Sequence, residues 1–138
     1  MIEQFEKVIN KAIEPQTLKR LRVMLVQEKE IQNVKYPAVF YNIVSSRVIN
    51  NSRDDYYVID EIQALAIKRA GKDYFADFDE LYEKIISIEK YTLEPTIFET
   101  GKLFKLTNVS NSVGDDNLQG LIAIRFNVEL HKNIKRSV

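Results

Sequence analysis

Residues 121–130 read Leu-Ile-Ala-Ile-Arg-Phe-Asn-Val-Glu-Leu, and this stretch decides the class of fold. Every second residue is large and apolar, namely Ile122, Ile124, Phe126, Val128 and Leu130. The residues between them are Ala123, Arg125, Asn127 and Glu129. Because successive side chains of a strand point to opposite faces of its sheet, this alternation predicts a strand with one buried face.

A long β-hairpin is predicted upstream of that strand. Residues 38–49 are rich in Val, Ile, Phe and Tyr, residues 50–55 are typical of a turn, and residues 56–67 are again apolar. The second strand is apolar on both faces, with Ile59, Leu65 and Ile67 on one and Val58, Ile62, Ala64 and Ala66 on the other. A strand of this kind is covered on both faces. We therefore expect the chain's own helices to cover one face and a neighbouring chain to cover the other.

Two segments have the period of an amphipathic helix. Residues 2–13 place apolar side chains at spacings of three and four, and Pro15 ends that helix. Residues 74–90 repeat the pattern after Asp73, whose carboxylate can cap a helix. The apolar side chains of this second helix are Phe75, Phe78, Leu81, Tyr82, Ile85, Ile86 and Ile88.

The remaining segments give weaker patterns. Residues 18–26 suit a strand or a helical turn, and we favour a strand because a polar connection follows. Residues 96–109 predict another strand, interrupted at Gly101, and residues 110–117 predict a flexible polar loop. The basic end, residues 131–138, is expected to be frayed.

The order of these pieces predicts an α+β domain. We expect a mainly antiparallel sheet of four to five strands with two helices packed on one face. The chain is 138 residues long, which is the size of one domain, and it contains no linker or internal repeat. Residues 1–138 are therefore predicted to form a single domain.

The composition excludes several classes of protein. Twenty basic and twenty acidic residues leave no net charge, which argues against a polycation that coats nucleic acid or an anionic membrane. The absence of Cys excludes disulfides and thiolate chemistry, and a single His excludes a multi-His metal site. No stretch approaches the roughly 18 apolar residues that span a bilayer. We expect no membrane association, no cofactor, no metal and no catalytic residue, and residues 1–6 do not resemble a signal peptide, which favours the cytoplasm.

Two groups of residues and the single histidine allow a chemical interpretation, which we weigh in each case against a simpler one. Asp54, Glu61 and Lys68 superficially resemble a metal-dependent nuclease, but Asp60 and Glu61 are strand neighbours that point to opposite faces. Asp115 and Asp116 lack the spacing of a calcium loop, so a polar loop is the simpler interpretation. His131 has no nucleophile to serve, and we expect an ordinary exposed side chain.

A second set of residues fits contacts with another protein. The mixed charges of Arg125, Asn127 and Glu129 suit a face that selects and orients a partner. Asp55 and Tyr56 lie at the expected hairpin tip, where one ring of the Tyr56-Tyr57 pair must face outward. Asp115 and Asp116 lie on the predicted loop. We predict these residues to be interfacial.

The assembled order resembles one family of viral proteins. The helix of residues 2–13, the strand start Tyr36-Pro37-Ala38-Val39, the hairpin, the second helix and the final strand Gly120-Leu121-Ile122-Ala123-Ile124-Arg125-Phe126-Asn127-Val128-Glu129 resemble the tail terminator (tail completion) proteins of long-tailed bacteriophages. The resemblance covers nearly the whole chain. The segment 16–35 and the basic end depart from the family's pattern.

The resemblance implies a non-enzymatic virion protein. In that family a homo-hexameric ring binds the end of the tail tube, stops its polymerisation and presents a surface to the head completion or connector protein. The expected location is the virion tail or neck, after assembly in the host cytoplasm. The genome would pass through the ring without sequence-specific contacts. The alternatives are another head–tail joining or tail-tube-like protein and, more remotely, the nuclease centred on Asp54, Glu61 and Lys68.

Overall fold

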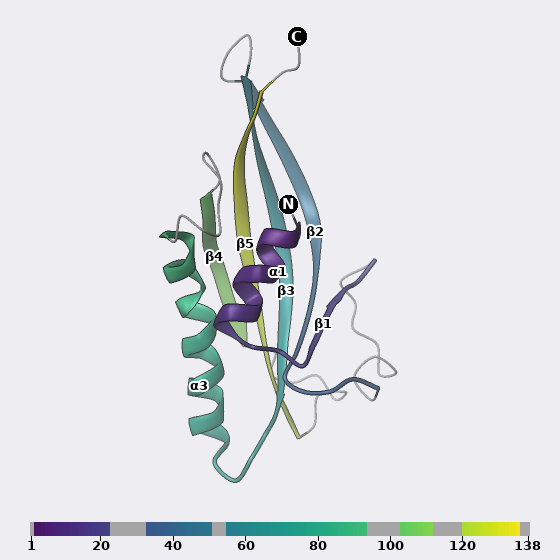
Figure 1. Cartoon of the computed structure of the whole chain (residues 1–138). Helices are drawn as coiled ribbons and strands as arrows, with labels where there is room; N and C mark the ends of the chain where they lie inside the picture. The colour runs from purple at the N-terminus through teal and green to yellow at the C-terminus, as the bar shows by residue number, and fades with distance from the viewer. Residues whose placement is uncertain (1, 23–32, 51–54, 94–102, 112–119, 136–138) are drawn as a thin grey trace.

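The computed structural model describes residues 2–22, 33–50, 55–93, 103–111 and 120–135. Its elements, in chain order, are α1 (Ile2–Ala12), β1 (Thr17–Arg20), β2 (Ala38–Asn50), β3 (Asp55–Arg69), α3 (Tyr74–Ile86), the 3-10 helix η1 (Ser87–Leu93), β4 (Leu103–Asn111) and β5 (Leu121–Lys135). In the described part of the chain the strands form one sheet in the order β1-β2-β3-β5-β4 (Figure 1). Among the described strands only β1 and β2 pair in parallel, so the predicted α+β class with a mainly antiparallel sheet is confirmed.

Strand β5 has the two faces that its sequence predicts. Ile122, Ile124, Phe126, Val128 and Leu130 are all buried. The strand is longer than expected, however, because its ladder with β3 continues from Arg69↔Leu121 to Asp55↔Lys135. The prediction of a frayed end is therefore wrong for residues 131–135, since β3 supplies hydrogen-bond partners that far. Residues 136–138 lie outside the described residues.

The predicted hairpin is also confirmed. Strands β2 and β3 are antiparallel from Ala38↔Ile67 to Asn50↔Tyr56, with an irregularity between Ile43 and Ser45. Val44 is the extra residue there, and such a bulge locally increases the twist of a strand pair. The far half of the hairpin extends beyond the helices, as Figure 1 shows.

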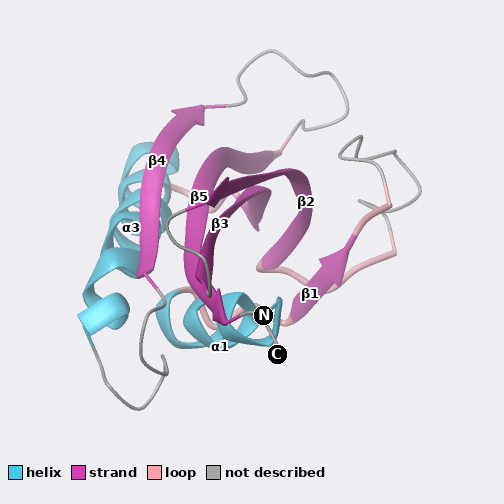
Figure 2. Cartoon of the chain, turned by 90° about the horizontal axis from the view of Figure 1, so that it is seen from above, coloured by secondary structure: helices cyan, strands magenta, loops and turns pink. Residues whose placement is uncertain are grey.

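Both helices cover one face of the sheet (Figure 2). Helix α1 buries Phe5, Val8, Ile9, Ala12 and Ile13. They share one core with Leu81 and Ile85 of α3, Ile88 of η1 and the inward side chains of β2, β3 and β5. Complete burial of one such side chain contributes about 1.5–3 kcal/mol, so this packing is the main reason that both helices stay in place.

The start of α3 forms as predicted, and its end differs. Asp73 caps the helix through a hydrogen bond from the Ala76 amide to its carboxylate at 3.1 Å. The α-helix stops at Ile86, and the chain continues to Leu93 as the 3-10 helix η1. The helical period of residues 74–90 is therefore real, but its last turns are wound more tightly.

The second face of β3 corrects an expectation. Within one chain the apolar side chains from Val58 to Ile67 are all buried, including Val58 and Ile59, which are 6% and 8% exposed. On the face away from the helices, Leu65 and Ile67 form a second cluster with Ala38, Phe40, Ala123 and Leu21, against which Val34, Tyr36 and Leu121 pack. The prediction that a neighbouring chain covers this face is wrong, because residues just after β1 and just before β2 fold back over it.

The weaker predictions are confirmed in part. The strand expected in residues 18–26 exists as β1 but ends at Arg20, and residues 23–26 lie outside the described residues. Of the segment 96–109, residues 103–109 belong to β4, and residues 96–102 are not described. Ser110 and Asn111 belong to β4 rather than to the predicted loop.

Candidate interaction surfaces

The polar residues of β5 lie on the sheet face away from the helices. Arg125, Asn127 and Glu129 alternate with the buried residues of the core and are themselves half-buried. On the adjoining strand β3, Gln63 faces Asn127 and Glu61 faces Glu129 in the register. The structure therefore brings the three predicted residues together with two others that the sequence analysis did not place beside them.

Hydrogen bonds connect the side chains of this polar face. Glu61 accepts from Asn127 Nδ2 at 3.4 Å and from Ser45 Oγ at 3.2 Å, while Glu129 Oε2 lies 2.8 Å from His131 Nε2. Like charges opposite one another destabilise a sheet. Here each of the two facing carboxylates has its own side-chain partner, Asn127 and Ser45 for Glu61 and His131 for Glu129. His131 is half-buried and paired, which corrects the expectation of an ordinary exposed side chain.

The other predicted interface residues are less fully described. Asp55 and Tyr56 are the first residues of β3, and they face Lys135 and Ile134 of β5 in the register. Their side chains are not described. Asp115 and Asp116 lie outside the described residues.

The structure separates the residues of the nuclease hypothesis. Glu61 and Lys68 are seven positions apart on one strand, which is about 24 Å, and an odd separation places them on opposite faces. Asp60 points away from Glu61, is only 3% exposed and accepts a hydrogen bond from Ser46 Oγ at 2.6 Å. Asp54 lies outside the described residues. Across the described ranges, no group of three His, Asp or Glu side chains could hold a metal ion.

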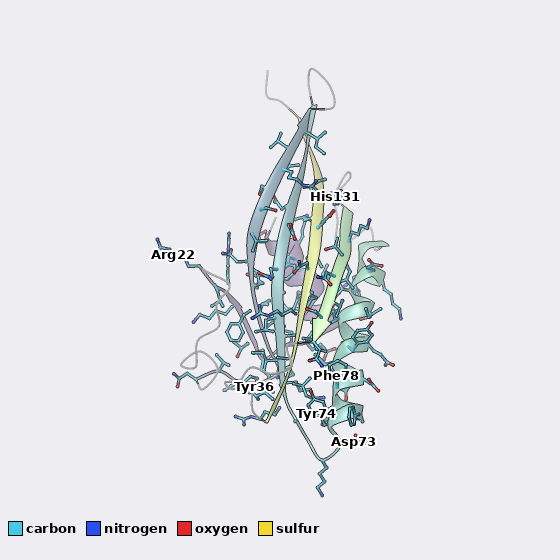
Figure 3. The ribbon with its side chains drawn as sticks, turned by 180° about the vertical axis from the view of Figure 1, so that it is seen from behind. Arg22, Tyr36, Asp73, Tyr74, Phe78 and His131 are labelled. Carbon is cyan, nitrogen blue, oxygen red and sulfur yellow. The ribbon has the colours of Figure 1, made fainter. Side chains whose placement is uncertain are left out.

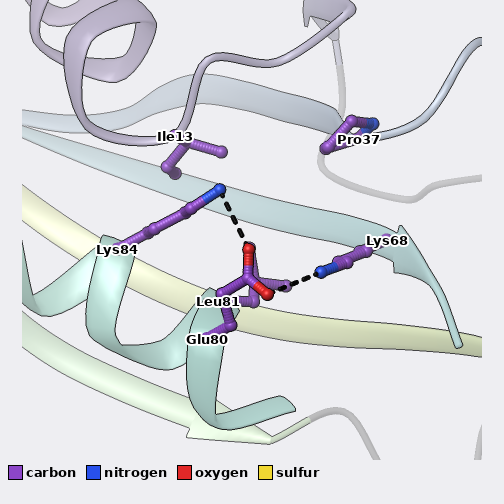
Figure 4. A pocket seen from close by; sticks show the side chains of 6 residues that line it. All are labelled: Ile13, Pro37, Lys68, Glu80, Leu81 and Lys84. Atoms are coloured by element: carbon purple, nitrogen blue, oxygen red, sulfur yellow. Dashed lines mark ion pairs between the residues drawn. The ribbon is translucent and has the colours of Figure 1, made fainter. Parts of the chain in front are cut away.

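Lys68 instead joins β3 to α3 (Figure 4). Its Nζ lies 3.4 Å from Glu80 Oε2 and 3.8 Å from Asp77 Oδ1, and Lys84 Nζ lies 3.4 Å from Glu80 Oε1. Lys68, and secondarily Lys84, lowers the pKa of the Glu80 carboxyl from its ordinary value. The adjoining cavity, between Ile13, Pro37 and Leu81, measures about 20 Å³, enough for one water molecule. This cluster fixes the helix against the sheet and offers no room for a substrate.

Helix α3 exposes an aromatic surface that the sequence analysis missed. Leu81 and Ile85 face the core, whereas other apolar residues of the predicted stripe face solvent. Phe75 is 75% exposed, and Tyr74, Tyr82 and Ile86 are 40–43% exposed. The rings of Tyr74, Phe78 and Tyr82 follow one another along the helix, with centroids 6.4 and 6.3 Å apart and nearly parallel planes. We call Tyr74, Phe75, Phe78, Tyr82 and Ile86 the α3 surface.

The sequence contains a signal for this surface. One core-facing stripe of a helix is roughly 100° wide. The apolar residues of α3 cover a wider arc than that, because Phe75, Tyr82 and Ile86 fall beside the arc of Leu81 and Ile85. A second apolar arc on a helix that already has a buried face indicates a second contact.

A second exposed apolar region lies at the far end of the hairpin, where apolar side chains are exposed on both faces of β2. We call residues 44–50 of β2, 55–60 of β3 and 130–135 of β5 the arm. On it Val48 is 64% exposed, although its cross-strand neighbour Val58 is buried, and Val44 and Ile49 are 49% and 44% exposed. Strand β1 pairs with β2 only as far as Tyr41, so among the described residues no strand borders the outer edge of the arm.

The two exposed surfaces lie in different parts of the molecule. Figure 1 shows the arm at one end of the sheet, beyond α1, and α3 alongside β4 toward the other end. In Figure 3 His131 marks the side nearer the arm, and Tyr74 and Phe78 lie far from it along the sheet. The chain cannot fold its own arm onto its own α3, because three paired strands hold the arm extended.

Comparisons with known proteins do not add a family to these observations. None of the helices in the described ranges has the length and apolar character needed to cross a membrane. No protein-family model and no curated protein matches the chain.

Proposed function

We propose that this chain is a non-enzymatic virion assembly protein, a ring-forming tail terminator of a long-tailed bacteriophage. In this role it caps the tail tube, stops tube polymerisation and joins the tube to the head connector. The support from the sequence is the resemblance carried by the Tyr36-Pro37-Ala38-Val39 strand start and the alternating strand β5. The support from the fold is the α+β architecture, in which Ala38 is the first residue of β2 as that motif implies.

The observation that carries the proposal is the pair of separate exposed apolar surfaces. A ring of identical subunits is built from head-to-tail contacts, in which each subunit offers two different surfaces to its two neighbours. The α3 surface and the exposed apolar residues of the arm are two such candidates, and they differ in side-chain type and in position. A dimer related by a two-fold axis needs only one self-complementary surface, so two unlike surfaces favour a closed ring or an open filament.

The burial of β3 removes its second face as the expected contact between subunits. Because one chain covers both faces of residues 58–67 by itself, the ring does not depend on that strand for its contacts. The polar face with Arg125, Asn127 and Glu129 is also internally hydrogen-bonded in part. The exposed apolar surfaces are therefore the stronger candidates for contacts between copies.

Native mass spectrometry with and without the tail-tube protein encoded by the same genome tests the proposal. We expect one discrete ring stoichiometry and tube growth that stops when the protein is added. Open filaments formed by the protein alone would instead identify a tube-like protein. A closed ring that binds the head connector but leaves tube growth unchanged would identify another head–tail joining protein. A protein that neither forms a ring nor binds tube or connector contradicts all three assembly roles.

A further inference from the structure

We infer that the end of β1 and the part of β2 beside it form a binding site for a phosphate group, held by the guanidinium groups of Arg20 and Arg22. The inference is independent of the proposed function, because it rests on the geometry and charge of one edge of the sheet. Phosphate groups occur on free nucleotides and along the backbone of a nucleic acid. Both sources present the same chemistry to the site, and titration with each of them separates the two.

The side chain of Asn42 on β2 fixes the geometry of the site. Its Oδ1 accepts hydrogen bonds from Arg20 Nε at 3.0 Å and from the Ile43 amide at 2.9 Å. Its Nδ2 donates to the Arg22 carbonyl at 3.1 Å. One amide group therefore holds both the guanidinium of Arg20 and the backbone of Arg22. A side chain that is already held in place loses less conformational freedom when a ligand binds to it.

Both guanidinium groups are available to a ligand. Arg20 and Arg22 are exposed, and neither forms an ion pair with any described residue. Asn42 engages only the Nε of Arg20, so the two terminal nitrogens of Arg20 make no hydrogen bond to any described residue. Such terminal nitrogens form parallel hydrogen bonds to two oxygens of one anion. Figure 3 shows Arg22 at the outer edge of the sheet, projecting away from the strands.

An open cavity of about 370 Å³ adjoins the two arginines. It is lined by Arg20, Leu21, Arg22 and Asn42, so its lining carries two positive charges and no carboxylate. Leu21 is only 5% exposed and belongs to the cluster on the face away from the helices, which gives the cavity a fixed apolar wall. Sites for small ligands measure about 300–1,000 Å³. The space therefore accommodates a phosphate together with part of the group that bears it.

The charge of the surrounding residues favours an anion. Residues 16–22 and 33–50 contain no Asp or Glu, and their bases are Lys19, Arg20, Arg22, Lys35 and Arg47. Glu6 of α1 contacts Tyr41, the register partner of Arg20, but it already accepts a hydrogen bond from the Tyr41 hydroxyl. Two arginines match the charge of about −1.5 to −2 on a terminal phosphate, or two successive phosphates of a nucleic acid. A single carboxylate would neutralise only one of them.

Titration of the isotope-labelled full chain, followed by nuclear magnetic resonance at constant ionic strength, tests the site. The probes are inorganic phosphate, thymidine monophosphate and a short oligothymidylate. We expect saturable shifts centred on Arg20 Nε and on the backbone amides of Leu21 and Arg22. Much tighter binding of the oligothymidylate than of the mononucleotide would identify a nucleic-acid backbone as the source, and comparable affinities would identify a small phosphorylated molecule. Shifts that do not saturate, or that acetate reproduces at the same concentration, overturn the inference.

Substitution of each arginine separates a defined site from general attraction to positive charge. Arg20→Gln and Arg22→Gln each remove one guanidinium, and each should weaken phosphate binding about tenfold, because a hydrogen bond to a charged group is lost. Both side chains are exposed, so neither change removes a core contact. Lys105→Gln is the matched control, because it removes an exposed base from β4 at the opposite edge of the sheet. Equal weakening by all three variants would show diffuse attraction and overturn the inference.

Asn42 acts in the site as a positioning residue. Asn42→Ala should move the Arg20 Nε signal before any ligand is added and should weaken phosphate binding, whereas Arg22→Gln should leave that ligand-free signal in place. An unchanged Arg20 Nε signal in Asn42→Ala would contradict the positioning role. If Asn42→Ala does not fold, the two arginine variants decide the matter. The result is separable from that of the proposed function, because phosphate binding by a protein that forms no ring supports this inference and contradicts only the terminator role.

Discussion

The hydroxyl of Tyr41 on β2 donates a hydrogen bond to Glu6 Oε1 on α1. Tyr41 is a fully buried side chain whose ring also packs against Phe5, at 4.8 Å between centroids. The first helix is thus attached to the central hairpin by an aromatic contact and by a charge-assisted hydrogen bond at the same point.

Removing that hydroxyl should destabilise the fold. Tyr41→Phe keeps the ring but leaves the Glu6 carboxylate without this donor, and we expect a loss of about 1–3 kcal/mol in the free energy of unfolding. Chemical denaturation followed by circular dichroism measures it. Tyr82→Phe, which alters a half-exposed ring on α3, is the control and should leave the denaturation midpoint unchanged. Equal midpoints for wild type and Tyr41→Phe would show that the bond contributes nothing.

The same tyrosine predicts a loss of stability at high pH. Burial, and then the hydrogen bond and negative charge of Glu6, raise the pKa of Tyr41 well above its ordinary value of 10.0. The folded state therefore binds the phenolic proton more tightly than the unfolded state does. The contribution of this protonated tyrosine to the free energy of unfolding is fully present below pH 10 and is lost as the pH rises above it. Alkaline unfolding curves should be less steep for Tyr41→Phe, and identical curves would contradict the prediction.

Glu80 predicts a loss of stability at low pH instead, because its pKa is lowered and not raised. Its lowered pKa means that the folded state favours the carboxylate, so its contribution is present above the ordinary value of 4.5 and is lost as the pH falls below it. Acid unfolding of Glu80→Gln should show a weaker pH dependence than the wild type in that range. Because the pair is exposed, added salt should shrink the difference. Glu83→Gln removes an acid of the same helix that forms no ion pair with any described residue, and it serves as the control.

The cap of α3 gives a test of local stability. Asp73→Ala removes the acceptor for the Ala76 amide and should cost about 1 kcal/mol, whereas Asp73→Ser should retain most of the stability. Thermal unfolding compares the variants. Asp79→Ala, in the middle of the helix, lacks a capping role and should have a smaller effect.

The remote nuclease hypothesis is tested by incubation with DNA and Mg²⁺. We expect no cleavage by the wild type, because Glu61 and Lys68 lie on opposite faces of β3 and far apart along it. Magnesium-dependent cleavage that disappears in Glu61→Ala would overturn the assembly role.

Local patterns predicted the elements more reliably than they predicted their surroundings. The alternation of Ile124 and Phe126 with Arg125 depends on strand geometry alone, and the capping role of Asp73 depends on three neighbouring residues, so both were accessible from the sequence. The cover over Leu65 was not, because Leu21 and Tyr36 reach it only through the tertiary path of the chain. A pattern shows that a face is buried and leaves open which atoms bury it.

For the candidate surfaces too, the sequence predicted local features and did not predict tertiary contacts. The placement of Arg125, Asn127 and Glu129 on one face follows from their spacing. Their pairing with Glu61 and His131 depends on the register between strands, which one sequence does not specify. The exposure of Phe75 depends on how α3 is rotated against the sheet, and that rotation is set by Leu81, Ile85 and the Lys68 ion pairs.

Strand β3 runs without interruption from the arm at Asp55 to the ion pairs of Lys68 with α3, a length of about 44 Å. In a closed ring, tension applied at the arm of one subunit would travel along this strand toward α3. The ladders on both sides of β3 lie across the direction of pull, so their hydrogen bonds share the load in shear instead of opening one after another. The sheet within each subunit would therefore bear tension well, and a stretched ring would open at the contacts between subunits before its subunits unfolded.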